Sequence, residues 1–293
     1  MKGVTLNLRW YHSDWGLGVV SRRFFILSLI ASILASLTLG PLMLLRARRW
    51  VDGLEVGVGY NVADGRVELP LPSLDGVVSV ERALANRRSV REYTGDPLGL
   101  RELSQILWAA YGVSEVSYGF KTTPSAGATY PLEVYAVAYP QGVMLPNGSY
   151  MEPGSYKYDP HTHTLTMVKR GDLSRELYEA GLRQDWILSA RACIVITAVY
   201  TRTTRRYGER GVRYVHIEVG HAAQNIYLQA TALGLATVAI GAFHDERVRE
   251  IIGAPPEEHV LYMMPLAKPR KPYSLKLEDL ARYIGERRRT GRT

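Results

Sequence analysis

The sequence contains a single cysteine, Cys193, in 293 residues. One thiol cannot form an intrachain disulfide or supply the ligands of a zinc ribbon or an iron–sulfur cluster, so these classes are excluded. Charged residues are also few, at 22%, while hydrophobic residues make up 46%. This balance is typical of a globular protein and argues against a largely disordered chain. The length allows one large core or two smaller ones.

Acidic residues are scarce at both ends of the chain, and this scarcity produces the formal net charge of +8. Residues 1–50 contain seven lysines and arginines against one acid, Asp14, and residues 282–293 contain five arginines against Glu286. The residues between these ends therefore carry a small net negative charge. A protein that binds along a nucleic-acid backbone needs positive charge on the surface of its folded domain. No nucleic-acid partner is therefore expected, and arginines 287–289 are interpreted as a solvated helix end.

The segment 24–45 contains no charged residue over 22 positions, which is long enough for a bilayer-spanning helix. Directly upstream, Ser21-Arg22-Arg23-Phe24-Phe25 resembles a twin-arginine export signal. A buried core helix is the alternative, but such a helix is rarely apolar on every face. No small-residue cleavage site follows, so residues 1–50 are interpreted as either a removed signal or an uncleaved anchor. We predict a membrane-associated or exported protein, with a tether facing the cytoplasm as the alternative.

Residues 51–77 are rich in glycine, proline and aspartate, and they predict a linker before a folded domain over 78–293. In that domain, apolar periodicity and capping residues predict helices over 98–111, 173–182, 215–233, 245–252 and 275–288. Short apolar runs predict strands over 132–139, 192–199, 236–240 and 260–264, with a hairpin over 155–168. Strands separated mostly by helices indicate an α+β or α/β single domain.

Two basic stretches are candidates for binding an anion. The first contains Arg87, Arg88, Ser89 and Arg91 within five residues, and the second contains Lys268 and Arg270 after a predicted strand. The planar guanidinium group forms bidentate hydrogen bonds, so the first stretch suits a phosphate dianion. Considered alone, this stretch is also explained as a solvated basic loop.

Two segments of small residues adjoin predicted strands. Pro124, Ser125, Ala126 and Gly127 precede one strand, and Ile240, Gly241 and Ala242 end another. Small residues allow the backbone to approach a flat ligand closely, and the ends of strands are common ligand sites in open sheets. An ordinary turn before a strand is the alternative for the first segment.

In this order and spacing, the four stretches resemble the nitroreductase family of flavoproteins. The motifs are R-R-S-x-R-x-Y, P-S-A-G-x-x-Y-P-L-E and G-H-x-x-Q-N-x-Y-L-Q-A, and the resemblance covers about residues 78–270. They look most like the SagB-type, McbC-like branch, which includes dehydrogenases that oxidise azoline rings in peptide natural products. The resemblance implies a nitroreductase-like α+β fold, with a mainly antiparallel sheet flanked by helices. It also implies a homodimer that binds FMN between its subunits.

The resemblance further implies a role for each stretch. The FMN phosphate and ribityl chain are expected at Arg87, Arg88, Ser89 and Arg91, with Lys268 and Arg270 closing on the phosphate. The partner subunit is expected to place Pro124, Ser125, Ala126 and Gly127 over the isoalloxazine ring. Ile240, Gly241 and Ala242 are expected on the other side of the ring. The family usually has glycine near Ala267, so the contact at that turn stays open.

The implied function is an FMN-dependent oxidoreductase that acts on a small-molecule or peptide substrate, with NAD(P)H as a candidate donor. No metal is expected, because His161-x-His163 offers only two ligands in a predicted exposed hairpin. Azoline-oxidising members carry a Lys-Tyr pair before the long helix; here Arg206 replaces the lysine and Tyr207 remains. Arginine does not deprotonate, so if the reaction needs a base, Tyr207 is the candidate catalytic residue, alone or with water. The alternative is that Arg206 and Tyr207 only tie the end of the strand to the following helix. The alternatives are an azoline-to-azole dehydrogenase and a membrane-tethered flavin-binding protein without catalysis.

Overall fold

The computed structural model of the chain describes residues 60–61 and 65–291. All described residues belong to one compact unit, which begins at Gly57. One sheet of eight strands, each antiparallel to its neighbours, organises this unit. In spatial order the strands are β1 (Tyr60–Asn61), β2 (Arg66–Glu68), β9 (Thr164–Arg170), β8 (Gly154–Asp159), β6 (Leu132–Ala138), β10 (Ala192–Ala198), β12 (His259–Ala267) and β11 (Ala236–Thr237).

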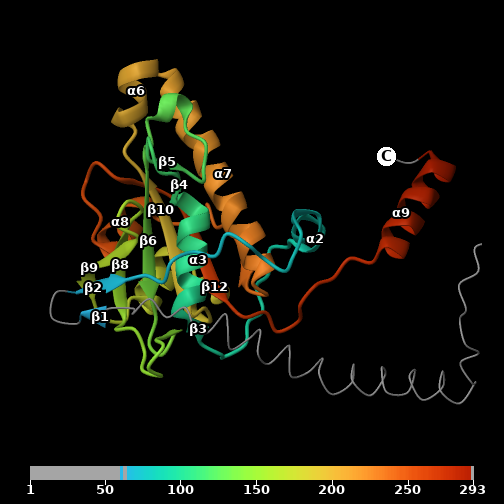
Figure 1. The fold of residues 1–293 in the computed structure, drawn as a ribbon, viewed down its shortest axis with the longest axis horizontal. Helices are drawn as coiled ribbons and strands as arrows, with labels where there is room; N and C mark the ends of the chain where they lie inside the picture. Colours follow the sequence, from blue (N-terminus) through green and yellow to red (C-terminus); the bar gives the residue numbers. More distant parts are fainter. Residues whose placement is uncertain (1–59, 62–64, 292–293) are drawn as a thin grey trace, which may run out of the picture. The chain divides into compact units, whose positions relative to one another are not determined.

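Helices and two short ribbons complete the described unit (Figure 1). The helices are α2 (Val80–Asn86), α3 (Leu100–Tyr111), α4 (Ser174–Ala180), α5 (Asp185–Leu188), α6 (Thr201–Tyr207), α7 (Arg210–Ala232), α8 (Asp245–Ile252) and α9 (Leu277–Thr290). The ribbons are the parallel pair β3 (Leu98–Gly99) and β7 (Val143–Met144), and the antiparallel pair β4 (Val113–Glu115) and β5 (Phe120–Lys121). A 3₁₀ turn, η1, covers Ala126–Ala128. The architecture is the predicted α+β fold with a mainly antiparallel sheet.

The central strand β10 is buried along its whole length because helices cover both faces of the sheet. All seven residues of β10 are buried, and successive side chains enter opposite cores. Ile194 and Ile196 pack in one core with residues of α3 and α7. Cys193 and Val195 pack in a second core with residues of α4, α5 and α8. Burial raises the pKa of the Cys193 thiol to about 12, so this cysteine is a packing residue.

Most predicted elements are found close to the predicted positions. The strand predicted over 236–240 is shorter, as β11, and residues 98–99 of the helix predicted over 98–111 form β3 instead. The helix predicted over 215–233 is α7, and it ends where Gly234 adopts a positive φ of 70° after the last helical turn. α7 begins at Arg210, earlier than predicted. The prediction missed its first residues because they carry no apolar periodicity. The predicted hairpin over 155–168 is formed by β8 and β9, which are joined across residues 160–163.

The linker predicted over 51–77 is wrong in its second half. Residues 66–68 form the strand β2, which pairs with β9, and Val67 and Leu69 are buried in the first core. Two isolated apolar residues between prolines and glycines give too weak a pattern to predict a strand. Pairing to an existing sheet edge supplies the missing stability, so the folded unit extends upstream of residue 78.

The hairpin residue His163 has a structural role. Its Nε2 lies 2.8 Å from Ser104 Oγ, and its Nδ1 lies 2.9 Å from Tyr158 OH. These contacts tie the hairpin to α3, while His161 lies exposed. Within residues 60–61 and 65–291, no group of three or more histidine, cysteine, aspartate or glutamate side chains is placed to hold a metal ion.

No helix in residues 60–61 and 65–291 is both long and apolar enough to cross a bilayer. The segment 24–45, on which the predicted signal or anchor depends, lies outside the described residues. The arginine pair Arg22-Arg23 and the first part of the predicted linker lie outside them as well.

Candidate functional site

The basic segment after α2 lies beside the basic segment after β12. The N–H of Thr94 donates to the Lys268 carbonyl at 2.9 Å, and the N–H of Arg270 donates to the Glu92 carbonyl at 3.0 Å. Between these bonds, Tyr93 pairs with Pro269 as an antiparallel bridge. The structure thus brings together the two cationic stretches that the sequence predicts for one phosphate, although they lie far apart in the chain. Their binding role stays a prediction.

A tyrosine of α7 joins this region to the chain after β11. The Tyr227 hydroxyl lies 2.9 Å from Ser89 Oγ and accepts from the N–H of Ala239 at 2.7 Å. The predicted flavin-facing residues begin at the next position, where buried Ile240 pairs with Met263. Gly241 and Ala242 follow it and are exposed. Sequence reasoning missed Tyr227, although it is the tyrosine of the motif G-H-x-x-Q-N-x-Y-L-Q-A.

The cations of this region have no carboxylate partner in the described part of the chain. The Arg87 guanidinium lies 5.2 Å from the ring centroid of Tyr227, and that of Arg88 lies 3.9 Å from the ring of Tyr273. Ring faces orient a guanidinium without neutralising its charge. The region therefore presents uncompensated positive charge, which suits a dianionic phosphate.

The structure accommodates alanine at position 267, the last residue of β12. Ala267 pairs with Ala236, and its side chain is fully buried in the second core. Its methyl group therefore packs away from solvent, and the cationic side chains begin one residue later, at Lys268. The second core therefore accommodates the alanine methyl group at the position where the family usually has glycine.

The second predicted segment, residues 124–127, forms a loop of unusual backbone conformation. Gly127, Ala128 and Tyr130 all have positive φ values, of 59°, 52° and 44°. Non-glycine residues in this region are strained, and such strain is concentrated at functional sites. Ser125 stabilises the loop, because its Oγ accepts from the N–H of Tyr130 at 2.9 Å.

Arg206 and Tyr207 of α6 lie against this loop. The Arg206 guanidinium donates to the Gly127 carbonyl at 3.1 Å. A Cβ built at position 127 would overlap the Tyr207 hydroxyl and press on the Arg206 guanidinium. The close approach therefore requires glycine at position 127, and the positive φ favours it as well. The structure joins the candidate catalytic residue Tyr207 to the predicted ring-facing loop.

The loop and the phosphate-side segment, the two predicted parts of the site, contact α7 at different positions along the helix. Glu218 accepts hydrogen bonds from Ser125 and from the Ala126 N–H of the loop, whereas Tyr227 contacts the phosphate-side segment. These positions are nine residues apart, which corresponds to about 13 Å of helix rise. Sequence reasoning also missed Glu218, because a glutamate in the middle of a long helix gives no signal of burial.

Comparison with known proteins identifies the family. The nitroreductase family model matches residues 84–268, more than half of the chain. The chain belongs to the nitroreductase family. The Methanocaldococcus jannaschii protein MJ1384, named as a nitroreductase, is 48% identical over 202 residues, and the match covers 69% of this chain and 96% of MJ1384.

Solved structures show the same nitroreductase-like fold. A Ralstonia eutropha JMP134 protein named as a nitroreductase matches with a TM-score of 0.61 and 24% identity, over 73% of this chain and 94% of the other. A chain of the E. coli microcin synthetase McbBCD complex with truncated pro-MccB17 bound matches with a TM-score of 0.56 and 17% identity, over 75% of this chain and 80% of the other. At these identities the likeness concerns the fold alone.

Nitroreductase family members are flavin-dependent oxidoreductases and are generally homodimers that use NAD(P)H. The residues of this nitroreductase-family protein fit a flavin mononucleotide. The cations at 87–91 and 268–270, which have no carboxylate partner among the described residues, suit its phosphate, and the exposed small residues at 241–242 suit its flat ring. When bound, the flavin supplies the hydride or electron chemistry, and the protein binds and orients the reactants.

Lys121 of β5 packs against two tyrosines beside the loop, Tyr111 and Tyr130. Its ammonium group lies 4.0 Å from the ring centroid of Tyr111 and 4.9 Å from that of Tyr130. Burial lowers the pKa of Lys121 to about 8, opposed by the nearby carboxylates of Glu133 and Glu218. The folded protein therefore releases this proton at a lower pH than the unfolded chain does.

Replacing Lys121 with methionine is expected to change how stability depends on pH. Between pH 8 and 10.5 the unfolded wild-type chain holds a proton that the folded protein has released, so this lysine makes stability rise with pH. The gain in unfolding free energy from Lys121→Met should therefore be larger at neutral pH than at pH 9.5. Urea unfolding of both proteins across this range measures the difference. The exposed Lys276→Met is the control, and a pH-independent difference for Lys121→Met would contradict the prediction.

Proposed function

We propose that this protein is an FMN-dependent oxidoreductase that transfers hydride or electrons between a donor and an organic substrate. The observation that carries the proposal is the convergence of two cationic segments, 87–91 and 268–270, near the exposed residues Gly241 and Ala242. Neither segment has a carboxylate partner among the described residues. FMN combines a phosphate dianion with a planar ring, and this region offers a matching partner for each. NADH or NADPH is the proposed donor.

The purified protein is expected to be yellow and to release FMN, rather than FAD, on denaturation. Its visible flavin absorption should disappear on reduction with dithionite and return in air. Chromatography of the released chromophore and anaerobic spectroscopy measure these outcomes. A folded protein that neither carries nor takes up FMN would refute the proposal. A protein that binds flavin but is not reduced by NADH, NADPH or any reduced substrate would support a binding function without catalysis.

We further propose that two copies of the chain complete each flavin site. This proposal is supported by the separation of the two site regions along α7, where Glu218 contacts the loop and Tyr227 contacts the phosphate-side segment. A loop from the partner subunit would cover the ring from the side opposite Ile240–Ala242. Light scattering of the flavin-loaded protein tests this arrangement, and a flavin-loaded monomer would overturn it.

Oxidation of an azoline ring in a peptide is the second candidate reaction. It is supported by the contact of Arg206 and Tyr207 with the loop at Gly127, because this loop is the segment proposed to cover the flavin ring. Arginine cannot act as the base that a lysine would be, so Tyr207 would have to act alone or with water. We therefore favour a general FMN oxidoreductase. Azole formation from an azoline peptide, lost in Tyr207→Phe, would reverse this choice.

We also propose that residues 1–50 direct the protein to the membrane or across it, on the basis of the uncharged segment 24–45 and the pair Arg22-Arg23. The twin-arginine route suits a protein that must fold around its cofactor before export. Fractionation of the native cells is the test. Recovery of the protein as a free cytoplasmic species would refute both the exported and the tethered forms.

A further inference from the structure

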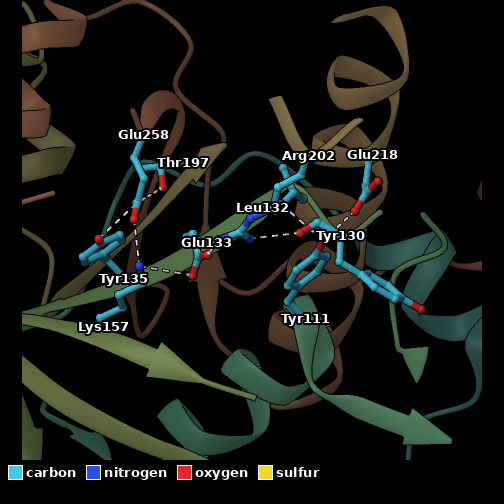
Figure 2. A network of polar contacts seen from close by, with 10 residues as sticks. All are labelled: Tyr111, Tyr130, Leu132, Glu133, Tyr135, Lys157, Thr197, Arg202, Glu218 and Glu258. Carbon is cyan, nitrogen blue, oxygen red and sulfur yellow. Dashed lines mark hydrogen bonds and ion pairs between the residues drawn. The ribbon is translucent and has the colours of Figure 1, made fainter. Parts of the chain in front are cut away.

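A buried carboxylate, that of Glu218, lies against the Ser125–Gly127 loop. The residue is only 2% exposed, and its Oε1 accepts from the Tyr111 hydroxyl at 2.6 Å, as Figure 2 shows. Glu218 also accepts hydrogen bonds from the Ser125 hydroxyl and from the Ala126 N–H. Two of its three donors thus come from consecutive residues of the loop. The third comes from the last residue of α3.

This carboxylate forms no ion pair in the described part of the chain. A buried charge without a cationic partner is stable only when hydrogen bonds satisfy it. The stability of the buried Glu218 carboxylate therefore depends on the loop donors, and the orientation of these donors depends on Glu218. If the loop moved away, the carboxylate would lose two of its three hydrogen bonds.

A second buried glutamate provides an internal comparison. Glu258 is also 2% exposed and accepts from a tyrosine hydroxyl, that of Tyr135, at 3.0 Å. Its other donors are Thr197 and Lys157, which belong to strands of the sheet. Figure 2 shows the two glutamates within one set of polar contacts. They share burial and a tyrosine donor, but only Glu218 contacts the loop.

We propose that Glu218 is the positioning residue of the flavin-binding loop, and that it fixes the direction of the Ser125 hydroxyl and the Ala126 N–H before the flavin arrives. Preorganisation of this kind increases affinity because less ordering remains to be done on binding. The inference rests on the proposed function, since it requires residues 124–127 to face FMN. Glu218 acts through the loop and is not assigned contact with the substrate or the flavin.

The charge state of Glu218 links the loop to pH. Burial raises the pKa of Glu218, opposed by its hydrogen bonds and by the ammonium group of Lys121. Among the other charged groups near this network, Glu133 acts on both Tyr111 and Lys121, while Arg202 and Asp159 act on Lys121. A proton on the Glu218 carboxyl occupies one acceptor position. Protonation therefore weakens its hold on the loop donors.

The test compares FMN dissociation constants of the full-length apoprotein and its variants. Glu218→Gln introduces an amide N–H₂ that cannot accept from the loop, and it should weaken FMN binding about tenfold. Glu258→Gln is the matched control, and it should change FMN affinity less than about twofold while lowering the unfolding temperature to a similar extent. Equal FMN affinities for the two variants would overturn the inference.

Two further measurements separate positioning from general destabilisation. The effects of Glu218→Gln and Ser125→Ala on FMN affinity should be less than additive in free energy, because both break one interaction. The ratio of the Glu218→Gln and wild-type dissociation constants should fall towards one as the pH is lowered. Additive effects or a constant ratio would contradict the proposal. If Glu218→Gln does not fold, Tyr111→Phe should weaken FMN binding in the same direction, and an unchanged affinity there would overturn it.

The outcomes also distinguish this inference from the proposed function. A wild-type protein that does not bind FMN refutes the proposed function. A wild-type protein that binds FMN, with a Glu218→Gln variant of equal affinity, refutes only the role of Glu218.

Discussion

Replacing Arg87 with alanine is expected to weaken FMN binding by about ten- to a hundredfold. Arg87 ends α2, where its N–H donates to Ala83 at 2.9 Å, and its guanidinium has no carboxylate partner in the described residues. A charge-assisted hydrogen bond to a phosphate contributes roughly 1.5–3 kcal/mol. Each 1.4 kcal/mol corresponds to about a tenfold change in affinity. Fluorescence titration of the apoprotein with FMN measures the change.

The control for Arg87→Ala removes the same charge elsewhere. Arg175 is exposed on α4, and Arg175→Ala should leave FMN affinity unchanged. A general loss of positive charge would affect both variants, whereas loss of a phosphate contact affects only the first. Riboflavin lacks the phosphate, so its weaker binding should be equal in wild type and Arg87→Ala. An unchanged FMN affinity in Arg87→Ala would mean that the phosphate lies elsewhere.

Replacing Gly127 with valine is expected to lower both stability and FMN affinity. The φ of 59° at this position disfavours any residue with a Cβ, and the added atoms would overlap the Tyr207 hydroxyl. The left-handed backbone alone costs roughly 1–2 kcal/mol, and overpacking adds about 1–3 kcal/mol. The loop must therefore move, and we expect FMN binding to weaken by at least about tenfold. Urea unfolding and FMN titration measure the two effects.

The control for Gly127 is a glycine with the same backbone requirement and open space around it. Gly148 has a φ of 83° and no atom within 4 Å of a built Cβ. Gly148→Val should lower stability through backbone strain but leave FMN affinity unchanged. The combination of Gly127→Val with Tyr207→Ala should restore part of the lost stability, because it removes the overlapping ring. Equal effects of the two glycine variants on FMN binding would contradict the assignment of the loop.

Local sequence pattern was sufficient for the long helices and the central strands. The uninterrupted apolar run of β10 and the apolar face of α7 predicted a buried strand and a long helix, and both are confirmed. These features are local because burial on two faces or on one helical stripe fixes the residue types along the segment itself. The strand β2 was missed because its stability comes from pairing with β9, and no local pattern records that partner.

The candidate site was predicted only in part. The motifs indicated residues 87–91, 124–127, 240–242 and 268–270, and the structure joins the first, third and fourth of these through backbone contacts and Tyr227. The contact of Arg206 and Tyr207 with Gly127 was not predicted, because it is made by side chains of α6 that reach across to another segment.

The sequence by itself determined the fold class, the family and the stretches of chain that carry the site, because motifs and periodicities are properties of consecutive residues. Only the tertiary structure decided that Glu218 is buried against the loop while Glu258, equally buried, serves the sheet. A glutamate has the same chemistry in either place. Which donors surround it depends on how distant segments pack. That packing places two loop donors on Glu218 and leaves the arginines at 87–91 without a carboxylate partner in the described part of the chain.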